Sequence, residues 1–241
     1  MKLALIGYGA MNRLVGEQAR GAGHEIAFVV SSKDAERAAS DVAEQLRGHD
    51  AAIDFSVAGA VLRNVEACAR ASVPLVEGTT GWKADEASVR RAVEEHGGAL
   101  VYGANFSIGV NIFYRIVAHA ARLFQAVEAY EPFVEEAHHS RKRDAPSGTA
   151  LHLRELLIEH GGATDISVAS TRAGHVPGTH RVGFDAAPDQ ILLTHEARSR
   201  EGFAAGALRA AEWMVKRRAS GVYEFSEVMD EIFESGSQDN A

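Results

Sequence analysis

A basic segment with two adjacent histidines is the part of this sequence whose residue types most directly suggest chemistry. It contains His138, His139, Arg141, Lys142 and Arg143, although the formal net charge of the whole chain is −8. Local positive charge of this kind favours a small anionic ligand. A histidine also titrates near neutral pH and can therefore give or take a proton during a reaction. A charged run taken by itself is more often a solvated face, which is the alternative interpretation.

The residues that follow this segment strengthen the prediction of an anion site. Ser147 is a favoured N-cap residue, so a helix is predicted to begin at Gly148. The backbone N–H groups of Gly148 and Thr149 would then have no partner within the helix. A carboxylate bound there would be stabilised by the helix dipole as well as by Lys142. Asp144 is expected to fix the loop through an Asx-type hydrogen bond rather than to act as a base.

A metal site is not expected at the histidine pair. Adjacent residues on a strand point to opposite faces, so His138 and His139 would not bind one ion together. The chain also has no HExxH motif and only one cysteine, Cys68.

A glycine turn near the start of the chain is typical of a nucleotide-binding site. The turn reads Gly7-Tyr8-Gly9-Ala10-Met11-Asn12 and lies between a short apolar run and a helical pattern. Gly7 permits a tight turn, and Gly9 lets the backbone approach a pyrophosphate at the helix N-terminus. Asn12 replaces the third glycine of the usual G-x-G-x-x-G pattern. A purely structural turn is the alternative.

The end of the second predicted strand should select the cofactor. An NAD site usually has Asp or Glu there, where it binds the ribose hydroxyls. This chain has Ser31, Ser32, Lys33 and Asp34. Ser32 and Lys33 could hold the 2′-phosphate of NADPH, whereas Asp34 could bind ribose if the strand ended later. The sequence therefore favours NADPH, with NADH as a second cofactor, and an ordinary solvated loop remains the alternative.

These residues need a scaffold, and the first hundred residues predict one. Short apolar runs at residues 2–6, 25–31, 51–55, 74–77 and 99–103 alternate with helical patterns. Such alternation with short connections indicates a parallel sheet with helices on both faces. Ligands bind beyond the carboxyl ends of the strands in such sheets, which is where the glycine turn lies.

The pattern changes after residue 105. Four β-rich stretches at residues 127–138, 166–172, 180–185 and 190–198 are interrupted by one helix at 148–160, and no helix separates the last three. This favours an antiparallel sheet. The predicted fold is α/β: a Rossmann-type doubly wound parallel sheet (residues 1–105 and 206–241) with an inserted α+β substrate-binding and oligomerisation domain (residues 106–205) built on an antiparallel sheet.

Composition excludes several classes of protein. A net charge of −8 argues against nucleic acids and anionic membranes as partners. No stretch approaches the roughly 20 apolar residues of a membrane span. Cys68 has no second cysteine to pair with, so nothing indicates an oxidising compartment. We expect a cytoplasmic protein in which Cys68 is buried.

Residues 138–150, HHSRKRDAPSGTA, resemble the signature of the dihydrodipicolinate reductase family, enzymes of lysine and diaminopimelate biosynthesis. Other matching pieces follow in the family's order over nearly the whole chain: GYGAMN at 7–12, DFS at 54–56, GTTG at 78–81, NFSIGVN at 105–111, RAG at 172–174 and AAGA at 204–207. The resemblance implies reduction of a cyclic imine with two carboxylates by NADPH or NADH. It also implies a homotetramer assembled through the sheets of the second domain.

The resemblance also implies residue roles. His138 would be the proton donor and acceptor and Lys142 a second catalytic cation, while His139, Gly148 and Thr149 would bind the substrate carboxylates. The cofactor would contact Gly7, Tyr8, Gly9, Ala10, Met11 and Asn12 at its pyrophosphate, Gly78, Thr79 and Thr80 near its nicotinamide, and Gly103, Ala104, Asn105 and Phe106 where the site closes.

Two other functions are compatible with parts of the sequence. A different dehydrogenase of small dicarboxylates, such as an aspartate dehydrogenase, would share the two-domain plan, but the run from His138 to Thr149 is specific to the reductase. A dinucleotide-sensing regulator that contacts DNA is disfavoured by the net charge of −8 and by the lack of any DNA-reading motif.

Overall fold

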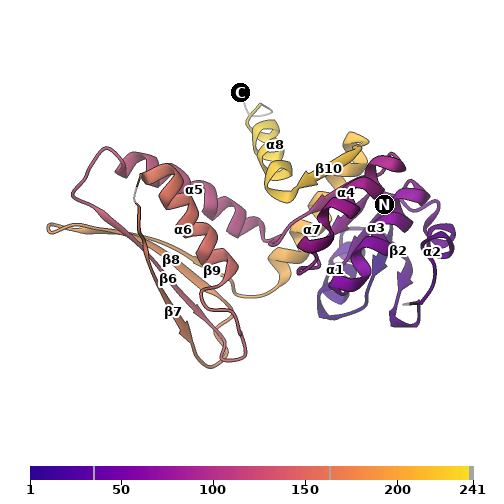
Figure 1. Cartoon of the computed structure of the whole chain (residues 1–241), viewed down its shortest axis with the longest axis horizontal. Helices are drawn as coiled ribbons and strands as arrows, with labels where there is room; N and C mark the ends of the chain where they lie inside the picture. The colour runs from indigo at the N-terminus through magenta and orange to yellow at the C-terminus, as the bar shows by residue number, and fades with distance from the viewer. Residues whose placement is uncertain (35, 163, 239–241) are drawn as a thin grey trace. The chain divides into compact units, whose positions relative to one another are not determined.

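The computed structural model describes residues 1–34, 36–162 and 164–238, and for Ser32 and residues 236–238 only the backbone. The chain divides into two compact units, Met1–Ile108 with Arg200–Ala241, and Gly109–Ser199 (Figure 1). The sequence placed the boundaries at residues 105/106 and 205/206.

The first unit contains a six-stranded sheet in the order β10-β5-β4-β3-β1-β2, and every neighbouring pair is parallel. Its strands are β1 (Lys2–Ile6), β2 (Glu25–Val30), β3 (Ala51–Asp54), β4 (Leu75–Glu77), β5 (Ala99–Tyr102) and β10 (Gly221–Glu224). Its helices are α1 (Ala10–Gly21), α2 (Ala39–Leu46), α3 (Val61–Ala71), α4 (Glu86–Glu95), α7 (Glu201–Arg217) and α8 (Phe225–Gln238), with 3₁₀ turns η1 (Ser32–Asp34), η2 (Ala58–Ala60) and η3 (Lys83–Asp85).

Two apolar layers cover the two faces of this sheet. Because successive side chains of a strand point to opposite faces, Leu3 and Leu5 pack in one layer with α1, α7 and α8, whereas Ala4 and Ile6 pack in the other with α2, α3 and α4. This is why the strands of a parallel sheet are apolar almost throughout. Cys68 lies buried in the second layer, as predicted.

The second unit has a four-stranded sheet in the order β7-β6-β8-β9, formed by β6 (Glu131–His138), β7 (Ser167–Arg172), β8 (Thr179–Asp185) and β9 (Gln190–Glu196). The prediction of an antiparallel sheet was wrong for one pair, because β6 and β7 run parallel. The reason is the helix α6 (Gly148–Gly161) between them, which carries the chain back to the same end of the sheet. The pairs β6–β8 and β8–β9 are antiparallel.

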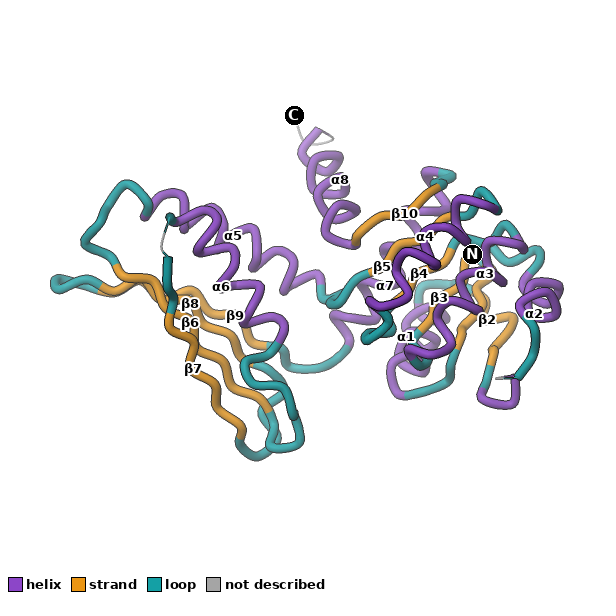
Figure 2. The backbone as a smooth tube through the Cα atoms, viewed as in Figure 1, coloured by secondary structure: helices purple, strands orange, loops and turns teal. Residues whose placement is uncertain are grey.

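Helices α5 (Ile108–Phe124) and α6 supply the core of the second unit (Figure 2). Phe113 and Val117 of α5 and Leu153 and Leu157 of α6 pack with buried residues of β6 and β8, including Val134. The inward-facing positions of this sheet therefore have helices above them, and this face carries the histidines described next. No helix within the described ranges is long and apolar enough to cross a membrane.

Candidate active site

The residues predicted to bind a cofactor follow the carboxyl ends of three parallel strands of the first unit. The glycine turn follows β1, residues 78–80 follow β4, and residues 103–106 follow β5. The order of the strands reverses between β1 and β3, which defines the usual crevice for a nucleotide. Gly7 has φ +82°, and a Cβ atom on it would lie 2.9 Å from Phe55 O, so only glycine fits where these two loops meet.

Helix α1 begins directly at this crevice and offers unpaired donors. Its N-cap Gly9 makes no side-chain cap, and no acidic residue lies in the first turn. The N–H groups of Ala10, Met11 and Asn12 therefore lack acceptors within the helix. A Cβ atom on Gly9 would meet nothing within 4 Å, which leaves its backbone open to a ligand. These features fit the pyrophosphate of a dinucleotide.

The side chain of Asn12 has another role than the one predicted for it. It is fully buried, and its Nδ2 donates hydrogen bonds to Ile6 O at 2.6 Å, Gly7 O at 2.9 Å and Ile53 O at 3.3 Å. The amide thus joins the ends of β1 and β3 below the turn. Asn12 can offer a ligand only its backbone N–H, and its side chain holds the shape of the turn.

Hydrogen bonds of Thr79 hold the loop after β4 in place. Thr79 N donates to Glu77 Oε1 at 2.7 Å, and Thr79 Oγ1 accepts from Ser56 N at 3.1 Å. A Cβ atom on Gly78 would lie 2.1 Å from the ring of Phe55, so the loop can approach this ring only with glycine there. Thr80 is exposed and available to a ligand.

The loop after β5 combines exposed and buried residues. Ala104 is exposed, and Asn105 Oδ1 accepts from Ser107 N at 2.9 Å. Phe106 was predicted to contact the cofactor, but its side chain is only 2% exposed and its ring lies 4.6 Å from that of Phe225, centroid to centroid. Its ring is therefore part of the core of the first unit. Gly103 N donates to the backbone of β4.

In the second unit, Glu136 is the centre of a buried polar group around the predicted catalytic residue His138. Its side chain is completely buried, and Oε1 accepts from Ser147 N at 3.0 Å, Ser170 Oγ at 2.7 Å and Arg172 Nη2 at 2.7 Å. Burial by itself would raise the pKa of Glu136, but the hydrogen bonds from Ser147, Arg172 and Ser170 lower it to about 2. Glu136 is a carboxylate at neutral pH, and it ties the end of β7 to the start of α6.

His138 lies within ion-pair distance of this carboxylate, although neither Glu136 Oε2 nor His138 Nδ1 has a well-aligned hydrogen-bond partner in the described structure. Glu136 Oε2 lies 3.2 Å from His138 Nδ1, which favours a proton on Nδ1 and leaves Nε2 to exchange protons. Burial lowers the pKa of His138, and Lys142 and Arg172 lower it further against the opposing charge of Glu136. A Cβ atom at residue 178 would lie 3.3 Å from His138 Nε2, so Gly178 leaves room beside that nitrogen.

His180 is a second buried histidine beside His138. Its Nε2 lies 3.3 Å from Ser147 Oγ and 3.8 Å from Glu136 Oε2. Burial and the neighbouring His138 lower the pKa of His180 to about 4, so it is neutral at neutral pH. Ligand-type atoms of Glu136, His138 and His180 lie within 4.8 Å of one another. Because Arg172 already balances the carboxylate, we assign this cluster to positioning His138.

The start of α6 has the geometry predicted from Ser147. The helix begins at Gly148, and Ser147 Oγ accepts from Ala150 N at 3.2 Å. Gly148 is exposed, and its N–H and that of Thr149 lie in the first turn, where the helix has no acceptors for them. Tyr114 of α5 hydrogen-bonds the side chain of Thr149. The helix start thus offers donors to a carboxylate.

Lys142 has a carboxylate partner in this structure. Its Nζ lies 2.8 Å from Asp144 Oδ2, and this bond lowers the pKa of Asp144. Lys142 N also donates to His139 O at 3.0 Å, which closes the turn. A substrate carboxylate that binds Lys142 must therefore displace Asp144 or share the ammonium group with it. His139 is partly buried and directly follows the last residue of β6.

Sequence reasoning assigned no role to Glu136, Arg172 or His180. Glu136 lies two residues before His138, which places both side chains on one face of β6. That spacing is a usable signal. The other two lie on β7 and β8, next to β6, and only the strand pairing brings them to His138.

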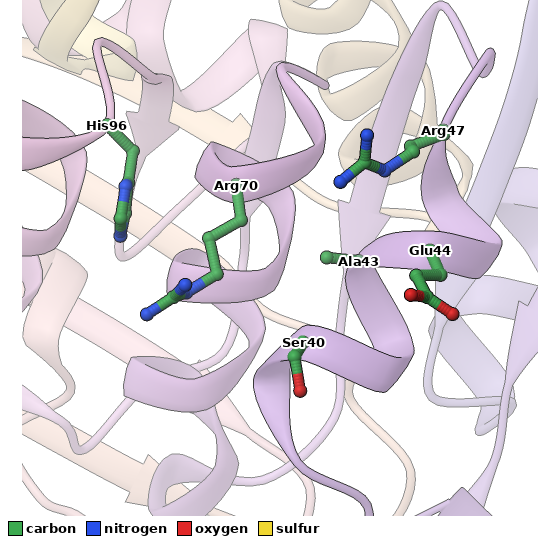
Figure 3. A pocket seen from close by; sticks show the side chains of 6 residues that line it. All are labelled: Ser40, Ala43, Glu44, Arg47, Arg70 and His96. Atoms are coloured by element: carbon green, nitrogen blue, oxygen red, sulfur yellow. The ribbon is translucent and has the colours of Figure 1, made fainter.

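A pocket of about 280 Å³ lies elsewhere on the first unit, between α2 and α3. Its lining residues are Ser40, Ala43, Glu44, Arg47, Arg70 and His96 (Figure 3). None of the residues predicted to bind a cofactor lines it, and Arg70 pairs with Glu66 Oε1 at 2.7 Å. We assign it no role in the reaction.

The fold and the site are those of an oxidoreductase with a Rossmann-type unit for a nicotinamide cofactor and a separate second unit built on a mixed four-stranded sheet. The particular family follows from the similarity of the chain to known protein families. Residues 1–106 match the family described as dihydrodipicolinate reductase, N-terminus, and residues 109–229 match dihydrodipicolinate reductase, C-terminus. The chain belongs to the dihydrodipicolinate reductase family.

Individual relatives agree with this assignment. The chain is 34% identical to the 4-hydroxy-tetrahydrodipicolinate reductase of Christiangramia forsetii, over 98% of this chain and 100% of that protein. It is 38% identical to the same enzyme of Anaeromyxobacter dehalogenans over 78% of this chain and 76% of that one. A dipicolinate-bound dihydrodipicolinate reductase from Paenisporosarcina sp. TG-14 has the same fold, with a TM-score of 0.74, 20% identity and coverage of 93% and 97%.

Proposed function

We propose that this protein reduces 4-hydroxy-tetrahydrodipicolinate to tetrahydrodipicolinate in lysine and diaminopimelate biosynthesis. The observation that carries the proposal is the Glu136–His138 pair, which lies beside the start of α6 because Ser147, the N-cap of that helix, donates its N–H to Glu136. His138 can exchange protons, and the start of α6 attracts carboxylates. When bound, the nicotinamide supplies a hydride to the ring carbon conjugated with the imine, after the hydroxyl group has left as water.

His138 supplies the proton that balances the hydride. In the free protein its pKa is lowered by burial, so the imidazole is neutral at rest. A bound substrate brings two negative charges, which raise the pKa of a neighbouring histidine and favour its protonation. His138 Nε2 then gives the proton to the ring, while Glu136 stabilises the imidazolium through Nδ1. Lys142 acts as the second catalytic cation, which stabilises the developing negative charge and also binds a carboxylate. His139, Gly148 and Thr149 anchor the carboxylates in this proposal.

We propose NADPH as the preferred cofactor. Asp34, the acid near the end of β2 that the sequence suggested for ribose binding, is engaged in its own loop. Its Oδ2 accepts from Ser31 N at 2.9 Å and its Oδ1 from Arg37 Nη1 at 3.1 Å, and these hydrogen bonds lower its pKa. Lys33 lies exposed in the same turn. Ser32 was also predicted to bind the 2′-phosphate, and its side chain lies outside the described part of the structure.

Replacing Lys33 by Ala should weaken NADPH binding about tenfold and leave NADH binding within about twofold, because only NADPH carries the 2′-phosphate. Fluorescence titration with each nucleotide measures both dissociation constants. Lys216→Ala removes an exposed lysine in the last turn of α7 and is the matched control. Equal weakening of both nucleotides by Lys33→Ala would exclude a phosphate contact.

The proposal also includes the homotetramer and the cytoplasmic location expected from the family. The solution mass by light scattering checks the assembly, since one chain is 25.8 kDa. A mass of a single chain at assay concentration would contradict it.

A coupled assay tests the proposed activity. Purified protein is mixed with dihydrodipicolinate synthase, pyruvate, aspartate semialdehyde and NADPH or NADH. Nucleotide oxidation should require both synthase substrates. Oxidation with oxaloacetate and ammonia instead would indicate the aspartate dehydrogenase alternative, and no oxidation with either set would refute reductase activity.

A further inference from the structure

Two buried carboxyl groups below the predicted nicotinamide loop take no part in the proposed reaction. Asp54 and Glu77 are the last residues of β3 and β4 and lie directly opposite each other in the parallel register. Both are 0% exposed. Within the described residues, the hydrogen-bond donors that reach them are uncharged groups of Ser56, Asn64 and Thr79.

The two groups are not equally satisfied. Asp54 Oδ1 accepts from Ser56 N at 2.7 Å, and its Oδ2 accepts from Asn64 Nδ2 at 2.6 Å. Glu77 Oε1 accepts from Thr79 N at 2.7 Å. Glu77 Oε2 is buried and has no well-aligned donor. Asp54 therefore has the environment of a carboxylate, whereas one oxygen of Glu77 lacks what a carboxylate needs.

Two negative charges cannot both remain at adjacent buried positions without a cation. A single proton on Glu77 Oε2 removes the second charge, gives that oxygen a hydrogen bond to make, and supplies Asp54 with another donor. Burial and the charge of Asp54 raise the pKa of Glu77 well above its usual range. Burial also raises the pKa of Asp54, but the hydrogen bonds from Ser56 and Asn64 oppose this rise, so the proton is assigned to Glu77.

We infer that Glu77 is a protonated carboxylic acid in the folded protein and a positioning residue for the loop at residues 78–80. Its hydroxyl donates to Asp54, and its carbonyl oxygen accepts the Thr79 N–H. The consequence for cofactor binding rests on the proposed function, whereas the protonation state is a property of the free protein.

The other titratable groups around the pair are accounted for. Burial raises the pKa of the Cys68 thiol of α3 well above its usual range, and the negative charges of the two carboxyl groups raise it further. The thiol therefore stays neutral. Arg63 hydrogen-bonds Asn64 Oδ1 at 2.7 Å and so orients the amide that donates to Asp54.

Infrared spectroscopy of the free protein at neutral pH tests the protonation directly. The wild-type protein should show the carbonyl stretch of a protonated carboxylic acid, above the amide I band and shifted to lower frequency in D₂O. Glu77→Gln should remove this band, while Glu95→Gln, at an exposed position of α4, should keep it. A wild-type spectrum without a band that Glu77→Gln removes would overturn the inference.

Thermal unfolding gives a second test with a defined sign. A carboxyl group whose folded pKa is raised binds a proton on folding, so its contribution to stability falls as pH rises above the unfolded value. Gln mimics the protonated acid without this pH dependence. The Tm of Glu77→Gln relative to wild type should therefore increase from pH 5 to pH 8. A relative Tm that stays constant or decreases over this range would contradict a raised pKa.

Nucleotide affinity tests the positioning role. Glu77→Gln keeps an acceptor for Thr79 N–H and a donor for Asp54, so its Kd for NADPH should stay within about twofold of wild type. Glu77→Leu removes both and should raise the Kd about tenfold or more. Equal affinity of Glu77→Leu and wild type would refute the positioning role and leave the infrared result intact. If Glu77→Leu does not fold, Glu77→Ala, which also removes both groups, is measured in its place, and an unchanged Kd would again refute the positioning role.

Discussion

Replacing His138 by Gln should lower kcat by about 10²–10⁴-fold while KM stays within about threefold. Gln cannot transfer a proton, so the hydride transfer loses its acid in the transition state. It retains a similar size beside Gly178, and the carboxylate-binding start of α6 is unchanged. Steady-state kinetics with the coupled synthase measures both constants.

His119→Gln is the matched control, because His119 is exposed on α5 and contacts none of the predicted site residues in the described structure. Its kcat should match that of the wild type. A large rise in KM with intact kcat for His138→Gln would move His138 into a binding role. The pH profile adds a check: kcat/KM should fall as pH rises through the lowered pKa of His138 in the free enzyme, whereas the decline in kcat should occur at higher pH.

Replacing Glu136 by Gln should lower both stability and activity. The buried carboxylate balances Arg172, and loss of its charge should cost about 3 kcal/mol of unfolding free energy at pH 7. Among molecules that remain folded, kcat should fall about ten- to a hundredfold, the effect of losing the carboxylate charge 3.2 Å from His138 Nδ1 that stabilises the imidazolium. Chemical denaturation and steady-state kinetics measure the two effects.

Acid titration of stability separates the role of Glu136 from a general effect. Its folded pKa of about 2 lies below its unfolded value of about 4.3, so its contribution of about 3 kcal/mol is complete above pH 4.3 and is lost as pH falls toward 2. His180, with a folded pKa of about 4, takes up a proton on unfolding, which lowers stability from about pH 6.5 down to 4. Glu136→Gln should lack the loss below pH 4.3.

Glu135→Gln is the control for both measurements. Glu135 is the neighbouring residue on the outer face of β6, half exposed and 3.7 Å from Arg181. Such surface pairs contribute about 0–1 kcal/mol, so this variant should resemble the wild type. A Glu136→Gln variant as stable as Glu135→Gln would show that the buried network does not depend on the charge.

Most of the first unit could be predicted because each strand is a short apolar run that must be buried on both faces. The strand β10, at Gly221–Glu224, was missed because it is four residues long and begins with glycine, so no periodicity marks it. The parallel pairing of β6 with β7 follows from the helix between them, but the prediction considered only the three later strands, which no helix separates.

The candidate site was predicted where one segment carries its own chemistry, as at the glycine turn and at His138. It was missed where the partners lie on different strands. Glu77 ends a three-residue strand, and nothing in the sequence distinguishes it from an ordinary charged residue. Only the strand register shows that it lies opposite Asp54. In the sequence, Asn12 is only a departure from a glycine pattern. The structure shows that its amide joins the ends of two strands. Such roles depend on tertiary contacts.

Transfer of deuterium from labelled nicotinamide to the product tests the central claim most directly. The coupled reaction is run with NADPH that carries deuterium at C4 on either face, and the tetrahydrodipicolinate formed is analysed by mass spectrometry. We predict that one of the two labelled cofactors delivers a single deuterium to the ring and that His138→Gln slows this delivery about 10²–10⁴-fold. Product that contains no deuterium from either cofactor would contradict the proposed hydride transfer. An unchanged rate of deuterium transfer in His138→Gln would contradict the role of His138.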